Sequence, residues 1–251
     1  MIEEKFASGL SFIHKLDPKT RVIAVTVLSF AAARCDNLSV AGLYFIIAAG
    51  LVIIANLNVQ DVIARIKPVF WFLLMIWILL PVTFEGQIIC HFSWLKISKA
   101  GVVTSCKITV KSITILLFFI SLTATMSLAS LGNALHKLYV PDKLVFLLLM
   151  SYRYIAVIED EYKRLLRAAK FRGFRPKTNI HSYKTFAYLA GMLFVRASFR
   201  AQRVHQAMLC RGFNKKFYSL DVYPAGRFNF IFLTAIFAAG LSLVMLEIIW
   251  I

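Results

Sequence analysis

The chain has 251 residues, of which 60% are hydrophobic and only 16% are charged, and its net charge is +17. Soluble domains carry about 25% charged residues, so this composition argues against a soluble protein and favours a membrane protein with several spans. The four cysteines form no C-x-x-C pair and have no zinc-ligand spacing, so we expect neither a disulfide framework nor a metal site.

Apolar runs along the chain predict an all-α, polytopic membrane helix bundle of about five spans. The residues before the first run have mixed charges and no signal-peptide cleavage pattern, so we expect the first span to remain in place. Pro68 is expected to open the third run, and Lys111 to lie near the start of the fourth, where it can reach lipid headgroups. The runs are residues 22–33, 38–57, 68–84, 108–129 and 228–251.

The segment 131–227 differs from the rest of the chain because it holds eighteen basic and five acidic residues, and so thirteen of the seventeen net positive charges. Cytoplasmic loops of membrane proteins are enriched in Lys and Arg, so we expect this segment and the N-terminus to be cytoplasmic. The expected parts are an N-terminal membrane domain of about four spans (1–130), the cytoplasmic segment (131–227) and a C-terminal transmembrane helix (228–251).

Two apolar stretches, 144–150 and 186–195, interrupt the basic segment. Each is about half of the roughly 20 residues that a span requires, so we expect them to belong to amphipathic helices. The alternative is that one of them is a short span, which would invert the later topology.

Two long helices are expected in the basic segment. The first begins at Pro141, a favoured first-turn residue, and continues to Gly173, which occupies the position of a C-terminal cap. The second begins near Ser182 as its N-cap and ends at Gly212.

The second helix carries a basic stripe, because Arg196, Arg200 and Arg203 follow helical spacing. Aromatic residues interleave with the bases of this segment, as a surface for nucleic acid or anionic lipid would require. Positive-inside bias explains the charge without nucleic acid, so we expect contact with membrane lipid and none with nucleic acid.

The two expected helices end in the same pattern. Residues 168–174 and 207–213 both read Ala-x-x-x-Arg-Gly-Phe, 39 residues apart. An Arg before a helix-ending Gly offsets the negative end of the helix dipole, and its exposed guanidinium can pair with a carboxylate of another protein. One copy would be an ordinary helix cap, whereas two copies suggest two equivalent contacts. The motif residues are Phe171, Arg172, Gly173, Cys210, Arg211 and Gly212.

These endings resemble the paired Ala-Arg-Gly motifs of the transmembrane T component of energy-coupling factor (ECF) transporters, and the cobalt-type branch, CbiQ, is the most similar. Residues 14–21 are similar to the start of that family, 140–161 to its first coupling helix and 196–208 to its second. Phe171 and Cys210 occupy the positions of Ala in the two family motifs, a departure that leaves both Arg-Gly pairs intact.

The resemblance implies a non-catalytic subunit of an ECF-type ABC importer in the cell membrane. In this family the T component holds a substrate-binding S component, and its two coupling helices sit in grooves of two ATPase subunits. Arg172 and Arg211, supported by Gly173 and Gly212, would lie at those contacts. The implied substrate is cobalt or nickel, and a vitamin S component remains open. The chain lacks a G-x-x-x-x-G-K-[ST] loop, so we expect no ATP hydrolysis, no catalytic residue and no cofactor here.

Two other functions stay open. A membrane enzyme would cluster His, Asp or Glu at helix ends or within spans, and the apolar runs hold almost no acids. Asp160 and Glu161 lie among bases, and we expect them to pair with Arg164 and Lys163 of the same helix. A conventional permease would place polar groups within its spans, although such groups also serve helix packing. The candidates are Thr123, Thr125 and Ser127.

Overall fold

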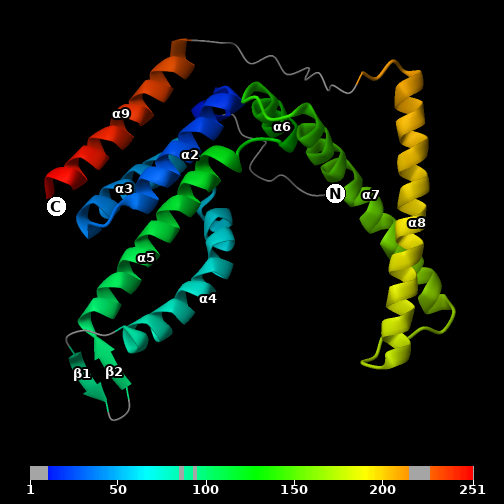
Figure 1. The fold of residues 1–251 in the computed structure, drawn as a ribbon, viewed down its shortest axis with the longest axis horizontal. Coiled ribbons are helices and arrows are strands. Elements are labelled where there is room, and N and C mark those ends of the chain that lie inside the picture. The colour runs from blue at the N-terminus through cyan, green and yellow to red at the C-terminus, as the bar shows by residue number, and fades with distance from the viewer. Residues whose placement is uncertain (1–10, 85–87, 93–94, 215–226, 251) are drawn as a thin grey trace. The chain divides into compact units, whose positions relative to one another are not determined.

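A computed structural model describes residues 11–84, 88–92, 95–214 and 227–250 and consists mainly of helices (Figure 1). The predicted all-α class is confirmed, with one small antiparallel hairpin of β1 (Ile88–Phe92) and β2 (Leu95–Ser98) in addition. Backbone contacts divide the chain into two units. We call Glu4–Ala134 with Asp221–Ile251 the bundle unit, and Met1–Glu3 with Leu135–Leu220 the arm unit.

The bundle unit contains one helix for each predicted apolar run. In the part of the chain that the structure describes, three helical segments are long and apolar enough to cross a membrane: Val59–Thr83, Lys99–Thr123 and Phe228–Glu247. The helices are α1 (Phe12–Lys15), α2 (Pro18–Arg34), α3 (Leu38–Ile54), α4 (Val59–Thr83), α5 (Lys99–Phe118) with the π-helical segment η1 (Phe119–Thr123), and α9 (Arg227–Trp250). This content is that of a polytopic membrane helix bundle.

α4 begins at Val59, nine residues before Pro68, which opens the apolar run. Both Pro68 and Pro81 lie inside α4. A proline within a helix removes one backbone hydrogen bond, but membrane helices tolerate it because neighbouring groups satisfy the freed carbonyl. An apolar run therefore marks the part of a helix that can lie in hydrocarbon, but it does not indicate the residue at which the helix begins.

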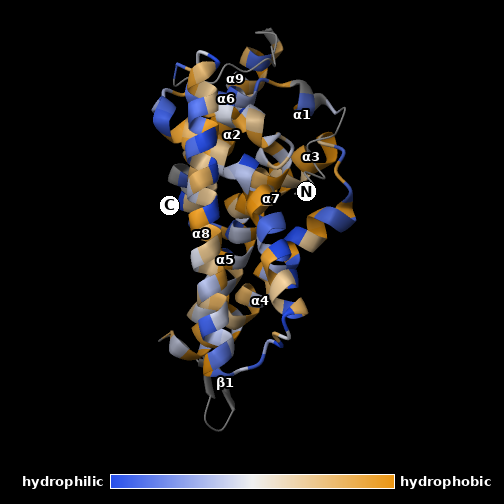
Figure 2. Cartoon of the chain, turned by 90° about the vertical axis from the view of Figure 1, so that its right-hand side faces the viewer, coloured by the Kyte–Doolittle hydropathy of each residue, from blue (hydrophilic) through white to orange (hydrophobic). Residues whose placement is uncertain are grey.

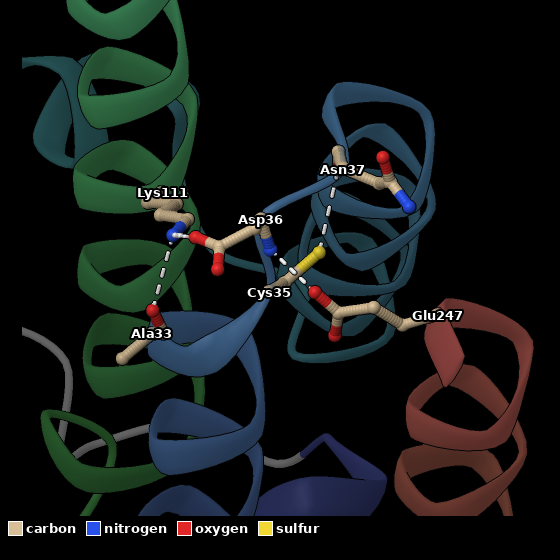
Figure 3. Close-up of polar contacts among 6 residues, drawn as sticks. All are labelled: Ala33, Cys35, Asp36, Asn37, Lys111 and Glu247. Carbon is tan, nitrogen blue, oxygen red and sulfur yellow. Dashed lines mark hydrogen bonds and ion pairs between the residues drawn. The ribbon is translucent and has the colours of Figure 1, made fainter. Parts of the chain in front are cut away.

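The polar turn between α2 and α3 is bonded to α5 and α9 (Figure 3). The ammonium of Lys111 donates to the carbonyl of Ala33 at 3.2 Å and lies 3.4 Å from the carboxylate of Asp36. The backbone N–H of Asp36 donates to the carboxylate of Glu247 in α9. Because α5 begins at Lys99, before the apolar run, Lys111 lies in the middle of the helix, where Asp36 pairs with it.

The core of the bundle unit joins the two ends of the sequence. α5 packs against α2, α3 and α4, and α9 packs against α2 and α3. The hydroxyl of the buried Tyr44 in α3 donates to the carbonyl of Gly240 in α9 at 3.3 Å. Leu28, Phe118 and Leu122 are also buried in this core.

A buried arginine connects the start of α2 to the chain after η1. Arg21 is 2% exposed, and its guanidinium donates to the carbonyls of Leu16 and His14, each at 2.7 Å. It also donates to the carbonyl of Thr125 at 3.5 Å. Backbone carbonyls thus satisfy a buried charged side chain, as a low-dielectric interior requires.

The arm unit contains two long helices, α7 (Asp142–Phe171) and α8 (Ile180–Cys210), and the end of α6 (Leu128–Lys137). The apolar stretches 144–150 and 186–195 lie within α7 and α8, and neither helix is among the candidate spans. Figure 2 shows hydrophilic and hydrophobic residues alternating along α8, as expected for an amphipathic helix.

The predicted N-cap of the second long helix is wrong. α8 begins at Ile180, and Asn179 occupies the N-cap position. Ser182 lies in the first turn, where its buried hydroxyl accepts a hydrogen bond from the backbone N–H of Lys177 at 3.1 Å. Helical side chains lean toward the N-terminus, so this hydroxyl reaches the preceding loop. At the other long helix, Pro141 directly precedes α7.

Candidate functional site

α7 ends in a turn built around Gly173. The N–H of Gly173 donates to the carbonyl of Lys170 at 3.0 Å, and the N–H of Phe174 donates to that of Ala169 at 3.1 Å. This pair of bonds is the Schellman motif, which satisfies the last carbonyls of a helix. Gly173 has a φ of +83°, a left-handed conformation that glycine adopts without side-chain strain.

α8 ends in the same way. The N–H of Gly212 donates to the carbonyl of Leu209 at 3.0 Å, and the N–H of Phe213 donates to that of Met208, also at 3.0 Å. Gly212 has a φ of +75°. The two endings thus agree in backbone hydrogen bonding as well as in sequence, and the structure places both glycines in the cap conformation.

The side chains that precede the two glycines are exposed to solvent. Arg172 and Arg211 are both exposed at the helix ends, and so is Cys210. Phe171 is 91% exposed. Each end therefore presents an exposed guanidinium directly before the cap glycine.

The phenylalanines that follow the glycines pack between the two helices. The ring of Phe174, after α7, lies edge-on to that of Phe186 in α8, with 5.5 Å between the ring centroids. The ring of Phe213, after α8, lies 5.5 Å from that of Phe146 in α7. Each turn is thus attached to the first half of the other helix, so α7 and α8 run antiparallel. The repeated pattern contained these phenylalanines, but their partners could not be read from it.

Sequence analysis missed the carboxylate that joins the two helices. Arg196 of α8 donates to the Oε1 atom of Glu161 in α7, and the guanidiniums of Arg164 and Arg200 lie 3.8 Å from its Oε2 atom. The side chain of Glu161 is only 12% exposed. The hydrogen bond from Arg196 holds the pKa of Glu161 below its ordinary value. Arg203, the third member of the predicted stripe, is exposed.

The predicted pairing within α7 is partly wrong. Glu161 does lie near Arg164, but its hydrogen bond is to Arg196 on the other helix. Lys163 pairs with Glu159, at 2.6 Å, instead of with Asp160 or Glu161. Glu159 and Lys163 are four residues apart and therefore face each other on the helix, whereas Glu161 and Lys163 are only two apart and do not.

A groove of about 440 Å³ lies between the first part of α7 and the second half of α8. Its lining is mainly apolar and extends from Phe146 to Glu161 on α7 and from Leu193 to Met208 on α8. Separate apolar runs gave no indication of this groove, because it depends on the angle at which the helices meet.

Polar groups after α5 form local hydrogen bonds. The hydroxyl of Thr125 donates to the carbonyl of Ser121 at 3.0 Å, and those of Ser127 and Ser130 lie 2.8 Å apart. These bonds join residues three or four apart along the chain, as is common for Ser and Thr hydroxyls. Among the residues that the structure describes, no group of three or more His, Cys, Asp or Glu is placed to hold a metal ion.

Comparisons with known proteins identify the family of the chain. The family CbiQ, described as "Cobalt transport protein", matches residues 9–222. The chain is 27% identical to the energy-coupling factor transporter transmembrane protein EcfT of Bacillus subtilis over 224 residues, which cover 85% of this chain and 84% of the relative. EcfT of Listeria innocua is 28% identical, with 85% and 84% covered, and EcfT of Leuconostoc gelidum subsp. gasicomitatum is 29% identical, with 83% and 82% covered. The chain therefore belongs to the CbiQ/EcfT family of transmembrane T components of energy-coupling factor transporters.

Proposed function

We propose that this chain couples two ABC ATPase subunits to a membrane S component that binds cobalt or nickel for import. The observation that carries the proposal is the pair of matching helix ends, Arg172-Gly173 and Arg211-Gly212. Both have the same Schellman geometry, and both leave the arginine exposed. Two helix ends with the same geometry are suited to bind two similar ATPase subunits.

The chemistry of each end favours an acidic groove on the partner. The guanidinium is planar and can form a bidentate pair with a carboxylate, while the C-terminal carbonyls of the helix favour a nearby cation. The φ of Gly173 and Gly212 lies in the region that glycine favours, so each turn has a fixed shape. A turn of fixed shape can transmit the movement of an ATPase to the attached helix of about thirty residues.

The charge distribution supports a cytoplasmic position for segment 131–227 and for the N-terminus, where ATP is available. The basic faces of this segment would also contact anionic lipid. Residues 1–10 and 215–226 lie outside the described residues, so the ends of this topology rest on the sequence alone.

The substrate would be selected by the S component and not by this chain. The matching family is described by cobalt transport, whereas the names of the EcfT relatives mention no substrate. We therefore propose cobalt or nickel, with a vitamin as the alternative. A coupling role requires neither a catalytic residue nor a cofactor in this chain.

The first test is purification of the tagged, detergent-solubilised protein from its native membrane, followed by identification of the co-purifying chains by mass spectrometry. Recovery of one or two ATPases with Walker motifs and a small hydrophobic protein supports coupling, and the small protein identifies the substrate class. Recovery of the chain alone, in cells that express the ATPases, contradicts the proposal.

Charge reversal at the helix ends tests the arginines directly. Arg172→Glu or Arg211→Glu should weaken ATPase association by ~10- to 100-fold, because a charge pair at an interface loses one partner. The double variant should nearly abolish uptake of radioactive cobalt, while folding and membrane insertion persist because both sites are exposed. Arg153→Glu, an exposed position in α7 that belongs to neither Arg-Gly end, is the matched control. Wild-type uptake in the double variant would exclude the coupling role of the arginines.

A further inference from the structure

We infer that Glu161 is a positioning residue: it fixes the crossing of α7 and α8 and so sets the distance between the two Arg-Gly ends. The effect of this inference on transport rests on the proposed function, whereas the effect on the distance between the two Arg-Gly ends does not. A glutamate of α7 bonded to arginines of α8 is not part of either Arg-Gly motif.

The position of the pair makes it a pivot. α7 and α8 are in contact and cross in Figure 1, and Glu161 and Arg196 join them across 35 residues of sequence. At a rise of 1.5 Å per residue, Arg172 lies ~16 Å along α7 from Glu161, and Arg211 lies ~22 Å along α8 from Arg196. A change of ~10° in the crossing angle would therefore move the ends by about 3 to 4 Å.

The charges around Glu161 explain why the carboxylate is needed. Three guanidiniums, those of Arg164, Arg196 and Arg200, converge on one carboxylate that is 12% exposed. With the carboxylate present, attraction across the helices opposes the repulsion among the arginines. Without it, the same three cations would repel each other at the point where the helices meet, and the crossing would open.

The surroundings of the pair are mainly apolar. On one side of Glu161 the helices diverge around the groove of about 440 Å³. Near the ends, the described ring contacts are those of Phe174 with Phe186 and of Phe213 with Phe146. These two ring pairs hold the helices together at both ends of the pair, and the ion cluster acts between them. The ion cluster is the charged part of the contact between α7 and α8.

Distances between spin labels at the two ends test this inference in the full-length protein in detergent. Cys210 is exposed and provides one label site, and Phe171→Cys provides the other after Cys35, Cys90 and Cys106 are changed to Ser. Glu161→Gln, which removes the charge and keeps the shape, should shift and broaden the distance distribution. An unchanged distribution overturns the inference.

Two further variants separate a charge effect from general destabilisation. Glu159→Gln is the matched control, because Glu159 pairs with Lys163 on its own helix and should not affect the crossing. The charge exchange Glu161→Arg with Arg196→Glu should return the distribution toward that of the wild type. A distribution as broad as that of Glu161→Gln in the exchanged pair, or in Glu159→Gln, would mean that the specific pair does not set the angle.

The second measurement compares substrate uptake with ATP hydrolysis in the purified complex. In Glu161→Gln each Arg-Gly end is intact, so the ATPases should still associate, but uptake per ATP should fall at least about threefold, within the range seen for residues between coupled sites. A wild-type ratio overturns the coupling consequence. If the wild-type protein recruits no ATPase, the proposed function fails, whereas the label distances still decide whether Glu161 fixes the crossing.

Discussion

Gly173 and Gly212 show how much a single backbone position contributes to the site. Both lie in the left-handed region, and a Cβ atom at either position would meet nothing within 4 Å. The requirement for glycine is thus conformational and not one of space, since a left-handed residue with a side chain costs about 1–2 kcal/mol.

Gly212→Ala should therefore loosen the end of α8 and weaken ATPase association, although no atom is displaced. Gly191→Ala is the control, because Gly191 lies inside α8 with equally open space and an ordinary φ. Alanine is the better helix former there, so this variant should be neutral or slightly stabilising. Binding of the ATPases to both variants, measured by co-purification at equal expression, checks the difference. Equal binding would show that the cap geometry is not needed.

Among the elements of the bundle unit, α4 and α5 approach each other at Gly101. A Cβ atom at this position would lie 2.7 Å from both the carbonyl oxygen of Leu80 and the Cα atom of Pro81. These are backbone atoms of α4, which cannot turn aside as a flexible side chain would. A small residue lets two membrane helices come close, as is common in membrane bundles.

Gly101→Ala should accordingly destabilise the bundle unit by about 1–3 kcal/mol, the usual effect of overpacking. Gly42→Ala in α3 is the control, since a Cβ atom there meets nothing within 4 Å. Thermal unfolding of both variants in the same detergent measures the effect. A melting temperature of Gly101→Ala equal to that of Gly42→Ala would contradict the close approach.

The contact between α7 and α8 should depend on pH through Glu161. Its hydrogen bond from Arg196 lowers the pKa in the folded state, so the stabilising effect is complete above the ordinary glutamate pKa of about 4.3. It is lost as the pH falls through the lower pKa of the folded state. The label distances should therefore stay constant between about pH 5 and pH 8 and broaden only in stronger acid.

The pH titration needs a control because His205 and the arginines face the same groove. The arginines keep their charge throughout this range, so they do not contribute to the change. Repeating the titration in His205→Gln separates the histidine from the glutamate. Broadening between pH 5 and pH 8 that persists in this variant would contradict the lowered pKa of Glu161.

For the whole molecule, the antiparallel course of α7 and α8 has a consequence for assembly. Arg172 follows α7 and Arg211 follows α8, so the two ends lie at opposite ends of the helix pair. A single ATPase subunit at one end would leave the other end free. The proposed complex therefore contains two ATPases for each copy of this chain.

Native mass spectrometry of the purified complex measures this ratio. The wild type should show two ATPase subunits, whereas Arg172→Glu and Arg211→Glu should each leave one, because the remaining end is unaltered. Loss of both subunits from either single variant would show that the ends act as one composite site. Arg153→Glu should retain two.

Local sequence was sufficient for part of this description. The apolar runs predicted the membrane helices and the two long helices, because composition and helical spacing are properties of neighbouring residues. The glycines that end α7 and α8 could be identified for the same reason. The boundaries of the helices did not follow in the same way: Pro68 lies inside α4, and Ser182 lies inside α8, where its hydroxyl accepts from Lys177 in the preceding loop.

The sequence by itself determined that this is a helical membrane protein with a basic segment and two matching helix ends. Only the tertiary structure decided which distant groups meet. Glu161 bonds to Arg196 across 35 residues, and Lys111 approaches Asp36 across 75. The physical reason is that helical periodicity fixes the face on which a side chain lies, whereas its partner depends on the angle and the spacing at which two helices pack.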